Sequence, residues 1–524
     1  MLQKPQPTTV TIYNPDNYSQ SAYSFVGEGL NLNIRRLFST KSHKPKDGTY
    51  LFPNGDRFQG FWKNRKLHGT GQMIFANGDK YEGKFCESQL TPTSTFLYKN
   101  LDTYQGAYNQ ASLRDGFGIY TFSNGDSYKG EFSNDSIQGT GSYTFKNLGE
   151  KYLGESADGK FHGAGTYVFY NGSTYEGNFE NNRITGYGVI TLPNGDVYKG
   201  AWSNNVRSGY GVLYFATGKI YKGNFSDNQK HGKGIEIYEN GDSYEGDFCA
   251  DSKQGWGVYN FNNGDKYVGT FENDAWVGEA SFYYIEGKIL HYKGNFSNGV
   301  RQGYGELNFR NADLYKGNFS DGVQDGLGKM IYINGDFYEG NFSSGLKDGH
   351  GKFYYSAKDK TYEGNWMGDL RNGEGQLVYH ATVEKYTGEF FDGRKHGFGV
   401  KYRANGKPLY KGEFIGGNID GVGTGFFSNG NVWYQGCWEN GQPHGSGVAY
   451  WYNGNKKYDG QFLEGLKSGY GILYDKYGRV EYEGQFLDDL FHGKGVGQTD
   501  RPWLVDRGVW DQGEFIERIA LVDF

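Results

Sequence analysis

The chain has 524 residues, of which 86 are glycine and 18% are aromatic, while the hydrophobic share is only 36%. Several aliphatic cores would need more Leu, Ile and Val, and a disordered chain would hold far fewer than 46 tyrosines and 38 phenylalanines. The net charge of −6 provides no basic field, which excludes nucleic acid as an expected partner.

Residues 1–45 lie before the regular part of the chain and are rich in Pro, Ser, Thr, Asn and Gln up to Ser24. We expect them to form a flexible N-terminal extension. The segment becomes basic near its end, where the candidate contacts for acidic lipid or a partner are Arg35, Arg36, Lys41, Lys44 and Lys46. A solvated basic tail remains the alternative interpretation of this cluster.

From Phe58 onward the pattern aromatic-x-Gly-x-aromatic recurs nineteen times and ends with the copy at Tyr482. The copies are spaced 23 or 24 residues apart, with one step of 25 residues between Tyr267 and Tyr292. A fixed period of this length is typical of a repeat architecture in which each repeat is one supersecondary unit.

Two further signals lie between the copies, a Gly-x-Gly sequence and then an Asn-Gly pair. Eleven Asn-Gly pairs occur at this place, and seven of them are followed by Asp, as in Asn77-Gly78-Asp79. Asn-Gly between two alternating segments is the strongest short-range signal of a hairpin, so we predict a type I′ turn at each pair. Each repeat is then a β-hairpin.

Side chains alternate along a strand, so Tyr81, Gly83 and Phe85 are expected to share one face of the sheet. The same holds for the matching residues of later copies, which are Tyr221, Gly223, Phe225, Tyr338, Gly340 and Phe342. Glycine inside a strand costs about 0.5–1 kcal/mol relative to alanine, so its recurrence requires a packing reason. We infer that rings of one hairpin cover the glycines of the next. The predicted fold is all-β, an elongated single-layer twisted ribbon of about nineteen tandem hairpins over residues 46–498.

The regular pattern stops at the C-terminal end and is interrupted at three places. Residues 499–524 are expected to cap the last repeat. The interruptions lie at 88–94, where Gly-x-Gly is absent, at the copy from Tyr152, whose second ring is replaced by Ser156, and at 276–291. Each is either a local irregularity or a kink or docking point, and Trp276 is a candidate partner contact.

No motif for catalysis or cofactor binding stands out from the repeat. The nearest approach to a phosphate-binding loop, Thr217-Gly218-Lys219, lacks the required hydroxyl residue. Histidines at one repeat position are too far apart along the ribbon to share a metal ion. We therefore expect no enzyme, no cofactor and no metal. Three cysteines are too few for a disulfide framework and favour a reducing, cytoplasmic setting.

Over residues 46–498, the 23-residue period with Tyr-x-Gly-x-Phe and Gly-x-Gly resembles the MORN repeat (membrane occupation and recognition nexus). The resemblance implies twisted ribbons of β-hairpins without a catalytic domain. It also implies a setting among cytoskeletal and ciliary scaffolds, such as axonemal radial-spoke heads, or among membrane-junction proteins.

Two functions therefore remain open. In the first, the chain is a structural scaffold in a cytoskeletal or ciliary assembly that binds protein partners along the ribbon, with a homodimer or end-to-end contact as a further expectation. In the second, it is a peripheral membrane tether that binds acidic phospholipids through the basic segment 35–46 and the repeats.

Overall fold

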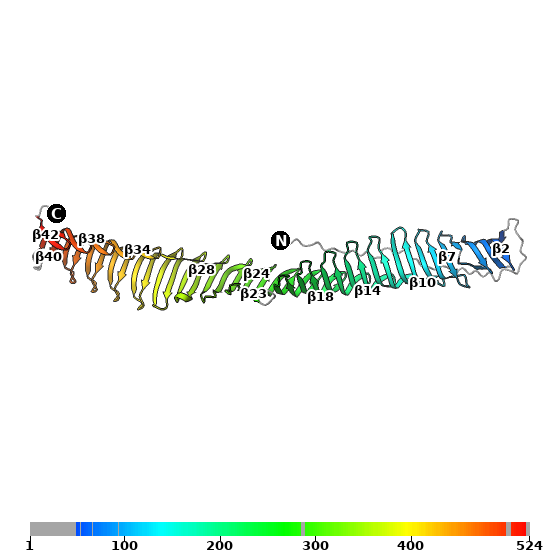
Figure 1. The fold of residues 1–524 in the computed structure, drawn as a ribbon, viewed down its shortest axis with the longest axis horizontal. Coiled ribbons are helices and arrows are strands. Elements are labelled where there is room, and N and C mark those ends of the chain that lie inside the picture. The colour runs from blue at the N-terminus through cyan, green and yellow to red at the C-terminus, as the bar shows by residue number, and fades with distance from the viewer. Residues whose placement is uncertain are drawn as a thin grey trace. The chain divides into compact units, whose positions relative to one another are not determined.

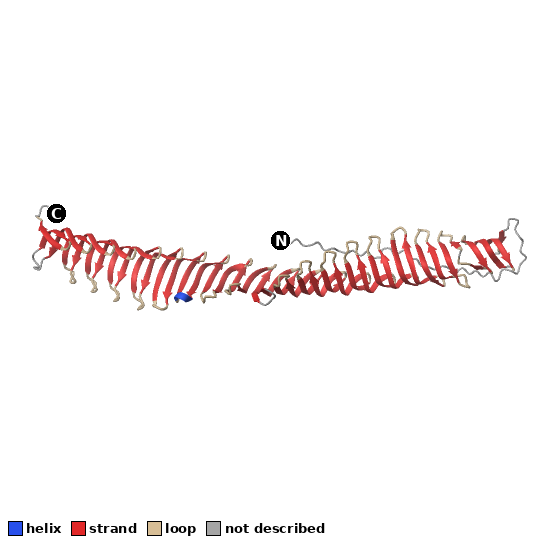
Figure 2. Ribbon diagram, viewed as in Figure 1, coloured by secondary structure: helices blue, strands red, loops and turns tan. Residues whose placement is uncertain are grey.

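The computed structural model describes residues 49–52, 54–64, 66–92, 94–284, 289–498 and 505–519. The chain divides into two compact units, residues 1–275 and 276–524. The boundary falls at the start of the irregular segment 276–291. The prediction of an all-β chain is confirmed, because the described residues hold strands and one short 3₁₀ helix, η3 (Ser356–Lys358) (Figure 2).

Each unit is an open antiparallel sheet in which strands pair with their neighbours along the chain (Figure 1). The first unit contains β1 (Thr49–Leu51), β2 (Arg57–Lys63), β3 (Lys66–Ile74), β4 (Lys80–Cys86), β5 (Gln89–Leu90), β6 (Thr95–Leu97), β7 (Thr103–Tyr108), β8 (Arg114–Thr121), β9 (Ser127–Ser133), β10 (Ser136–Phe145), β11 (Glu150–Ala157), β12 (Lys160–Val168), β13 (Thr174–Glu180), β14 (Arg183–Thr191), β15 (Val197–Ser203), β16 (Val206–Tyr214), β17 (Ile220–Ser226), β18 (Gln229–Ile237), β19 (Ser243–Cys249), β20 (Ser252–Asn260) and β21 (Lys266–Glu272). The second contains β22 (Ala275–Tyr284), β23 (Ile289–Ser297), β24 (Val300–Asn308), β25 (Leu314–Ser320), β26 (Val323–Ile331), β27 (Phe337–Ser343), β28 (Leu346–Tyr355), β29 (Lys360–Met367), β30 (Leu370–Tyr379), β31 (Glu384–Phe391), β32 (Arg394–Tyr402), β33 (Pro408–Ile415), β34 (Asn418–Phe426), β35 (Val432–Glu439), β36 (Gln442–Tyr450), β37 (Lys456–Leu463), β38 (Leu466–Tyr474), β39 (Val480–Leu487), β40 (Leu490–Gln498), β41 (Val505–Asp511) and β42 (Glu514–Arg518).

The turns at the Asn-Gly pairs differ from the prediction. Gly78 has a φ of +98°, but Asn77 does not adopt a positive φ. Phe75 donates its N–H to the carbonyl of Asp79 at 2.9 Å, and Gly78 donates to the carbonyl of Phe75 at 2.9 Å. This is a three-residue loop that ends in a left-handed glycine, so the predicted two-residue type I′ turn is wrong. Asn77 instead accepts the N–H of Asp79 through its side chain at 3.0 Å, which stabilises the loop.

The type I′ turns lie at the opposite edge, where an aromatic-x-Gly-x-aromatic strand leads into a Gly-x-Gly strand. Between β15 and β16, Asn204 and Asn205 have φ values of 47° and 67°. The second turn residue also bonds to the preceding repeat. Asn205 donates its N–H to the carbonyl of Ile184 at 3.0 Å, and its side chain accepts the Ile184 N–H at 2.7 Å. Each such turn therefore ties two repeats together.

The core of each unit is built on the face that carries the first tyrosine of every repeat, and we call it the inner face. Tyr221 is fully buried, and Gly223 is paired across the sheet with Gly234 of the next strand. A Cβ added at Gly223 would lie 2.5 Å from the Tyr221 hydroxyl oxygen and 2.6 Å from the Gly234 Cα. The tyrosine ring thus covers a glycine of its own hairpin as well as one of the next hairpin, which extends the inferred arrangement.

The tyrosine hydroxyl has a fixed partner that the sequence analysis missed. Tyr221 donates its O–H to the backbone carbonyl of Asn224, three residues along the chain, at 2.9 Å. The same bond occurs at every copy that begins with tyrosine, at 2.6–3.3 Å. Burial raises the pKa of the Tyr221 phenol, which keeps the donor protonated. The bond explains why the first aromatic residue is tyrosine and not phenylalanine.

The rings form a continuous ladder along the inner face. The Tyr221 ring meets Phe225 of its own strand edge to face at 5.2 Å between centroids, and Phe248 of the next repeat at 5.0 Å. Equivalent contacts link Tyr198 to Phe225 and Tyr244 to Phe248. Edge-to-face pairs of this kind are worth about 0.5–1.5 kcal/mol beyond the area that they bury. A single-layer sheet therefore obtains its core from rings on one face.

In two of the irregular repeats, another side chain compensates for the departure from the pattern. Ser94 is buried and lies over Gly83, and its hydroxyl accepts the N–H of Lys84 at 2.8 Å. Where Ser156 replaces the second ring, its cross-strand partner is Phe161, which stacks on Tyr152 at 3.9 Å between centroids. The aromatic ring has moved to the opposite strand of the pair, so the ladder continues.

The predicted N-terminal extension lies outside the described residues. In the predicted C-terminal cap, residues 505–519 form the strand pair β41 and β42, and β41 pairs with β40. Trp510 continues the ladder, with its ring 5.5 Å from that of Tyr482.

Replacement of Gly223 by valine is expected to disrupt this packing locally. The branched side chain would collide with the Tyr221 ring and the paired strand, at a cost on the order of 3 kcal/mol. Hydrogen exchange should show lost protection in β16 to β19, with distant repeats unchanged. Asn224→Val, on the exposed face of the same strand, is the matched control. Unchanged protection in the Gly223→Val protein would contradict the packing described above.

Candidate functional site

The face opposite the rings, which we call the outer face, exposes large side chains in the first unit. Tyr187, Tyr210 and Trp256 occupy the middle of Gly-x-Gly on β14, β16 and β20. They are 62%, 62% and 54% exposed. Two residues further along, the same strands and β18 carry a second line of apolar residues. We call the whole set the outer row: Tyr187, Val189, Tyr210, Val212, Ile235, Trp256 and Val258.

Polar and charged side chains separate the members of the outer row. Lys199 is paired with Val189 on one side and Val212 on the other, and Lys222 is placed between Val212 and Ile235 in the same way. The pairing of the strands fixes the backbone positions from which these side chains project. The outer face therefore presents exposed aromatic groups, a residue type enriched at protein interfaces, with lysines between its aliphatic residues.

The inner face carries a row of basic side chains across from the second ring of many repeats. Lys230 lies over Tyr221 at 5.6 Å and over Phe248 of the next repeat at 5.1 Å. Other members have the same kind of ring contact, and we call the set the cation row: Arg114, Arg207, Lys230, Lys253, Arg301, Lys347, Arg371, Lys395 and Lys467. Cation–π contacts of this type are worth about 0.5–2 kcal/mol.

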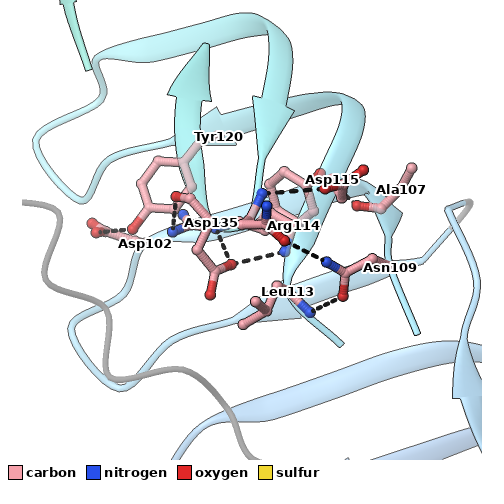
Figure 3. Close-up of polar contacts among 10 residues, drawn as sticks. Asp102, Ala107, Asn109, Leu113, Arg114, Asp115, Tyr120 and Asp135 are labelled. Carbon is pink, nitrogen blue, oxygen red and sulfur yellow. Dashed lines mark hydrogen bonds and ion pairs between the residues drawn. The ribbon is translucent and has the colours of Figure 1, made fainter. Parts of the chain in front are cut away.

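Several members of the cation row also have a carboxylate partner at the type I′ turn that follows. Arg114 contacts Asp135 at 3.0 Å, and the Arg114 guanidinium donates a second bond to the Asp135 carbonyl at 2.9 Å (Figure 3). Asp135 is the second residue of its turn, with a φ of 69°. The same arrangement pairs Lys253 with Asp274, Lys347 with Asp369, and Lys467 with Asp489, at 3.3, 2.8 and 2.7 Å.

One acidic group is buried on the inner face. Glu236 pairs with Tyr221 across the sheet, where the neighbouring repeat has Leu213, and it is 2% exposed. It contacts Lys219 at 2.7 Å and Lys230 at 2.8 Å, and it accepts a bond from the Tyr238 hydroxyl at 2.6 Å. Burial by itself would raise the pKa of Glu236, but the two lysines outweigh it and lower that pKa to about 2.

The residues that the sequence analysis selected fall into two groups. The tyrosine-glycine-phenylalanine sets at Tyr81, Tyr221 and Tyr338 lie on the inner face, with both rings of each set buried. Trp276 lies half-buried on β22, 5.8 Å from the Phe296 ring, at the place where other repeats carry the cation row. The basic residues Arg35, Arg36, Lys41, Lys44 and Lys46 lie outside the described residues.

Sequence reasoning missed the outer row and the cation row. The signals were present: a large apolar residue inside Gly-x-Gly, and a basic residue two positions before it, as at Lys230 and Lys253. Within the described ranges, no group of three or more His, Cys, Asp or Glu side chains is arranged to hold a metal ion. No helix among these same residues is both long enough and apolar enough to span a bilayer.

The burial of Glu236 predicts a pH dependence of stability. Its pKa in the folded chain lies below the ordinary value of 4.5, so its contribution is present above about pH 4.5 and is lost as the pH falls towards 2. We expect the urea midpoint of the unchanged protein to fall between pH 6 and pH 3, in part because this contribution, on the order of a few kcal/mol, is being lost. In Glu236→Leu the fall should be smaller. The exposed Glu245→Leu serves as control, and equal pH dependence in all three proteins would contradict the assignment.

The MORN repeat matches residues 48–57, 58–80, 104–127, 128–149, 152–174, 175–197, 198–220, 221–243, 292–313, 315–337, 338–360, 362–380, 386–407, 410–432, 434–456, 458–476 and 482–496. These matches cover more than half of the chain. No curated protein matches it in sequence.

Solved structures that resemble the chain do so weakly. The TCP10 domain of Danio rerio CPAP, solved with a peptide of Danio rerio STIL, is 13% identical with a TM-score of 0.18 and covers 49% of this chain and 99% of its own. The TCP domain of Drosophila melanogaster SAS-4, solved with a proline-rich motif of Ana2, is 15% identical with a TM-score of 0.17 and covers 36% and 90%. At such TM-scores the likeness carries no argument about partner or activity. The matches to the MORN-repeat model cover more than half of the sequence, so the chain belongs to the MORN-repeat family.

Proposed function

We propose that this chain is a non-enzymatic scaffold that binds protein partners along the outer row of its first unit. The observation that carries the proposal is the exposure of Tyr187, Tyr210 and Trp256, each more than half accessible on a paired strand. Family membership supports it, because the matched sequence consists of repeat units.

Exposed aromatic side chains on a rigid support are effective anchors for a partner. Trp and Tyr are enriched among the interface residues that contribute most to binding. Each has only two side-chain torsions, so it supplies a large contact area at a low cost in conformational entropy. From β14 to β20 the row spans six strand spacings, about 29 Å at ~4.8 Å each. This length suits the central part of a standard interface of about 800 Å² per partner.

We further propose that the assembly is cytoskeletal or ciliary, with an axonemal, radial-spoke-like setting as the most specific form. This setting rests on the resemblance described above. The alternative function is a peripheral membrane tether that binds acidic phospholipids through the basic segment 35–46 and the repeats. The basic segment lies outside the described residues, and the described repeats offer no observation that favours this alternative over the scaffold.

The proposal is tested by a triple variant, Tyr187→Ser, Tyr210→Ser and Trp256→Ser, in the full chain. Affinity purification from the native cell, followed by quantitative identification of co-purifying proteins, should show a set of partners reduced about tenfold or more. The melting temperature should change little, because these side chains lie on the exposed face. Tubulin or axonemal components among the lost partners would support the cytoskeletal setting.

A matched control comes from the second unit. Tyr304 and Leu327 are 57% and 65% exposed at the same repeat position, but the residues that follow them in line are Glu306 and Lys329. The double variant Tyr304→Ser and Leu327→Ser should keep the partners. The proposal would be contradicted if the triple variant recovered its partners unchanged, or if the control variant lost them equally. It would also be contradicted if the protein were recovered only with membranes and high salt released it from them.

A further inference from the structure

The cation row is neutralised unevenly, and the reason lies in the type I′ turns. Lys347 and Lys467 each face an aspartate at the second turn position, Asp369 and Asp489. Arg371 faces Gly393 at the same turn position, and Gly393 donates its N–H to the carbonyl of Arg371 at 3.0 Å. Lys395 faces Gly417 in the same way, and Gly417 donates its N–H to the carbonyl of Lys395 at 2.9 Å.

Arg371 and Lys395 are therefore two consecutive members of the row without a turn carboxylate. Arg371 lies 5.2 Å from the Phe390 ring centroid, and Lys395 lies 4.9 Å from that of Tyr386. Lys360 adds a third cation at the position that holds aspartate in Asn-Gly-Asp repeats, 4.8 Å from the Tyr355 ring. Within the described part of the chain, none of the three cations has a carboxylate oxygen within 4 Å.

The surrounding charges leave this part of the inner face basic. Lys401 is a fourth cation, and it contacts Glu384 at 3.7 Å. Glu384 also acts on Lys395, and its charge opposes the effect of the neighbouring cations on the pKa of Lys395. Burial, together with the charges of Lys401, Arg371 and Lys360, lowers the pKa of Lys395 to about 8. All three uncompensated side chains are half-buried, so part of each remains accessible. An anion placed here would relieve their mutual repulsion.

Elsewhere in the row, an uncompensated cation stands alone. Arg207 has Asn228 at its turn, but the next member, Lys230, is neutralised by Glu236. Arg301 has Gly322, and the residue at the next position is the neutral Gln324. The stretch β29–β32 differs from both because its free charges are adjacent.

We propose that the inner face of β29–β32 binds an acidic polypeptide segment in an extended conformation, through Lys360, Arg371 and Lys395. The charge of the segment complements the cations. Its spacing fits as well: Arg371 and Lys395 lie one repeat apart, about 9.6 Å for two strands. A polyproline II chain rises about 3.1 Å per residue with three residues per turn, so acidic side chains at every third position project about 9.3 Å apart on one side.

A narrow chain also suits the depth of the site. The cations lie against ring faces and are half-buried, so a carboxylate on a side chain can reach them, whereas a flat bilayer contacts groups that protrude. The site lies on the inner face of the second unit, whereas the outer row lies on the outer face of the first unit, so the two sets share no residue. The triple outer-row variant should therefore keep this binding, which separates failure of one proposal from failure of the other.

The test restores the missing partner. Gly393 has a φ of 74°, close to the 72° of Asp489, and a Cβ added to it would meet Leu370 only at 3.8 Å. Gly393→Asp should pair with Arg371 as Asp135 pairs with Arg114, whereas Gly393→Asn fits the same turn without a charge. The probe is a fluorescent twelve-residue peptide with glutamate at every third position and proline or alanine between, titrated by anisotropy against the full chain at low salt.

We expect saturable binding that Gly393→Asp weakens about tenfold and Gly393→Asn changes by less than about twofold. Lys395→Gln should weaken it similarly, whereas Lys467→Gln, whose lysine already has Asp489, should not. A peptide of the same composition with its glutamates clustered should bind more weakly.

The proposal would be overturned if the peptide did not bind, or if Gly393→Asp and Gly393→Asn had equal effects. It would also be overturned if the peptide did not bind and Gly393→Asp instead weakened binding to phosphatidylserine vesicles or to a single-stranded oligonucleotide. If Gly393→Asp fails to fold by circular dichroism, the comparison of Lys395→Gln with Lys467→Gln decides.

Discussion

The structure depends on one contact, a tyrosine ring that lies over a pair of glycines on adjacent strands. At Tyr221 the ring covers Gly223 and Gly234, and its hydroxyl donates to the carbonyl of Asn224. A methyl group at either glycine would occupy the space that the ring fills. Because the ring is buried against its own sheet, no second layer is needed, and the pattern can repeat for as long as the sequence repeats.

Hydrogen bonds at both edges convert this contact into a cooperative array. At one edge Asp196 accepts the N–H of Ala216 in the next repeat at 2.8 Å, and at the other Asn205 bonds to Ile184 of the preceding repeat. These bonds use turn residues and backbone groups, so they leave the side chains of the outer face free to vary. The cation row is not independent in this way, because the same turns decide whether its charges are neutralised.

Much of this fold could be predicted from the sequence because each repeat signals its own strands. The period, the shared face of Tyr81, Gly83 and Phe85, and the hairpins follow from local pattern alone. The turn type could not be predicted in this way. Asn-Gly is compatible with a two-residue type I′ turn and with a three-residue loop that ends in a left-handed glycine, and the choice depends on the hydrogen bonds of Asp79. The sequence analysis also missed that Phe161 supplies the ring that is absent at Ser156, because this can be seen only from the cross-strand register.

The candidate surfaces were harder to predict for a similar reason. Within one repeat, a residue such as Tyr187 or Lys395 does not indicate a binding surface. It becomes part of one only because neighbouring repeats place equivalent residues in line with it. Whether a cation is neutralised depends on a turn residue 22 positions away, as with Arg371 and Gly393. Such relations follow from the register between repeats and not from the pattern within one.

Alkaline titration of the full chain tests the central contact most directly. From Tyr104 onward, burial raises the pKa of the first tyrosine of each repeat, to about 12 at Tyr198 and Tyr292, above the ordinary value of 10. Their contribution to stability is therefore present below pH 10 and lost as the pH rises through the folded values. Phenol absorbance and far-ultraviolet circular dichroism, followed together, should reveal a class of tyrosines that ionises only as the strand signal disappears. Ionisation of all 46 tyrosines near pH 10, with the strand signal intact, would contradict the account.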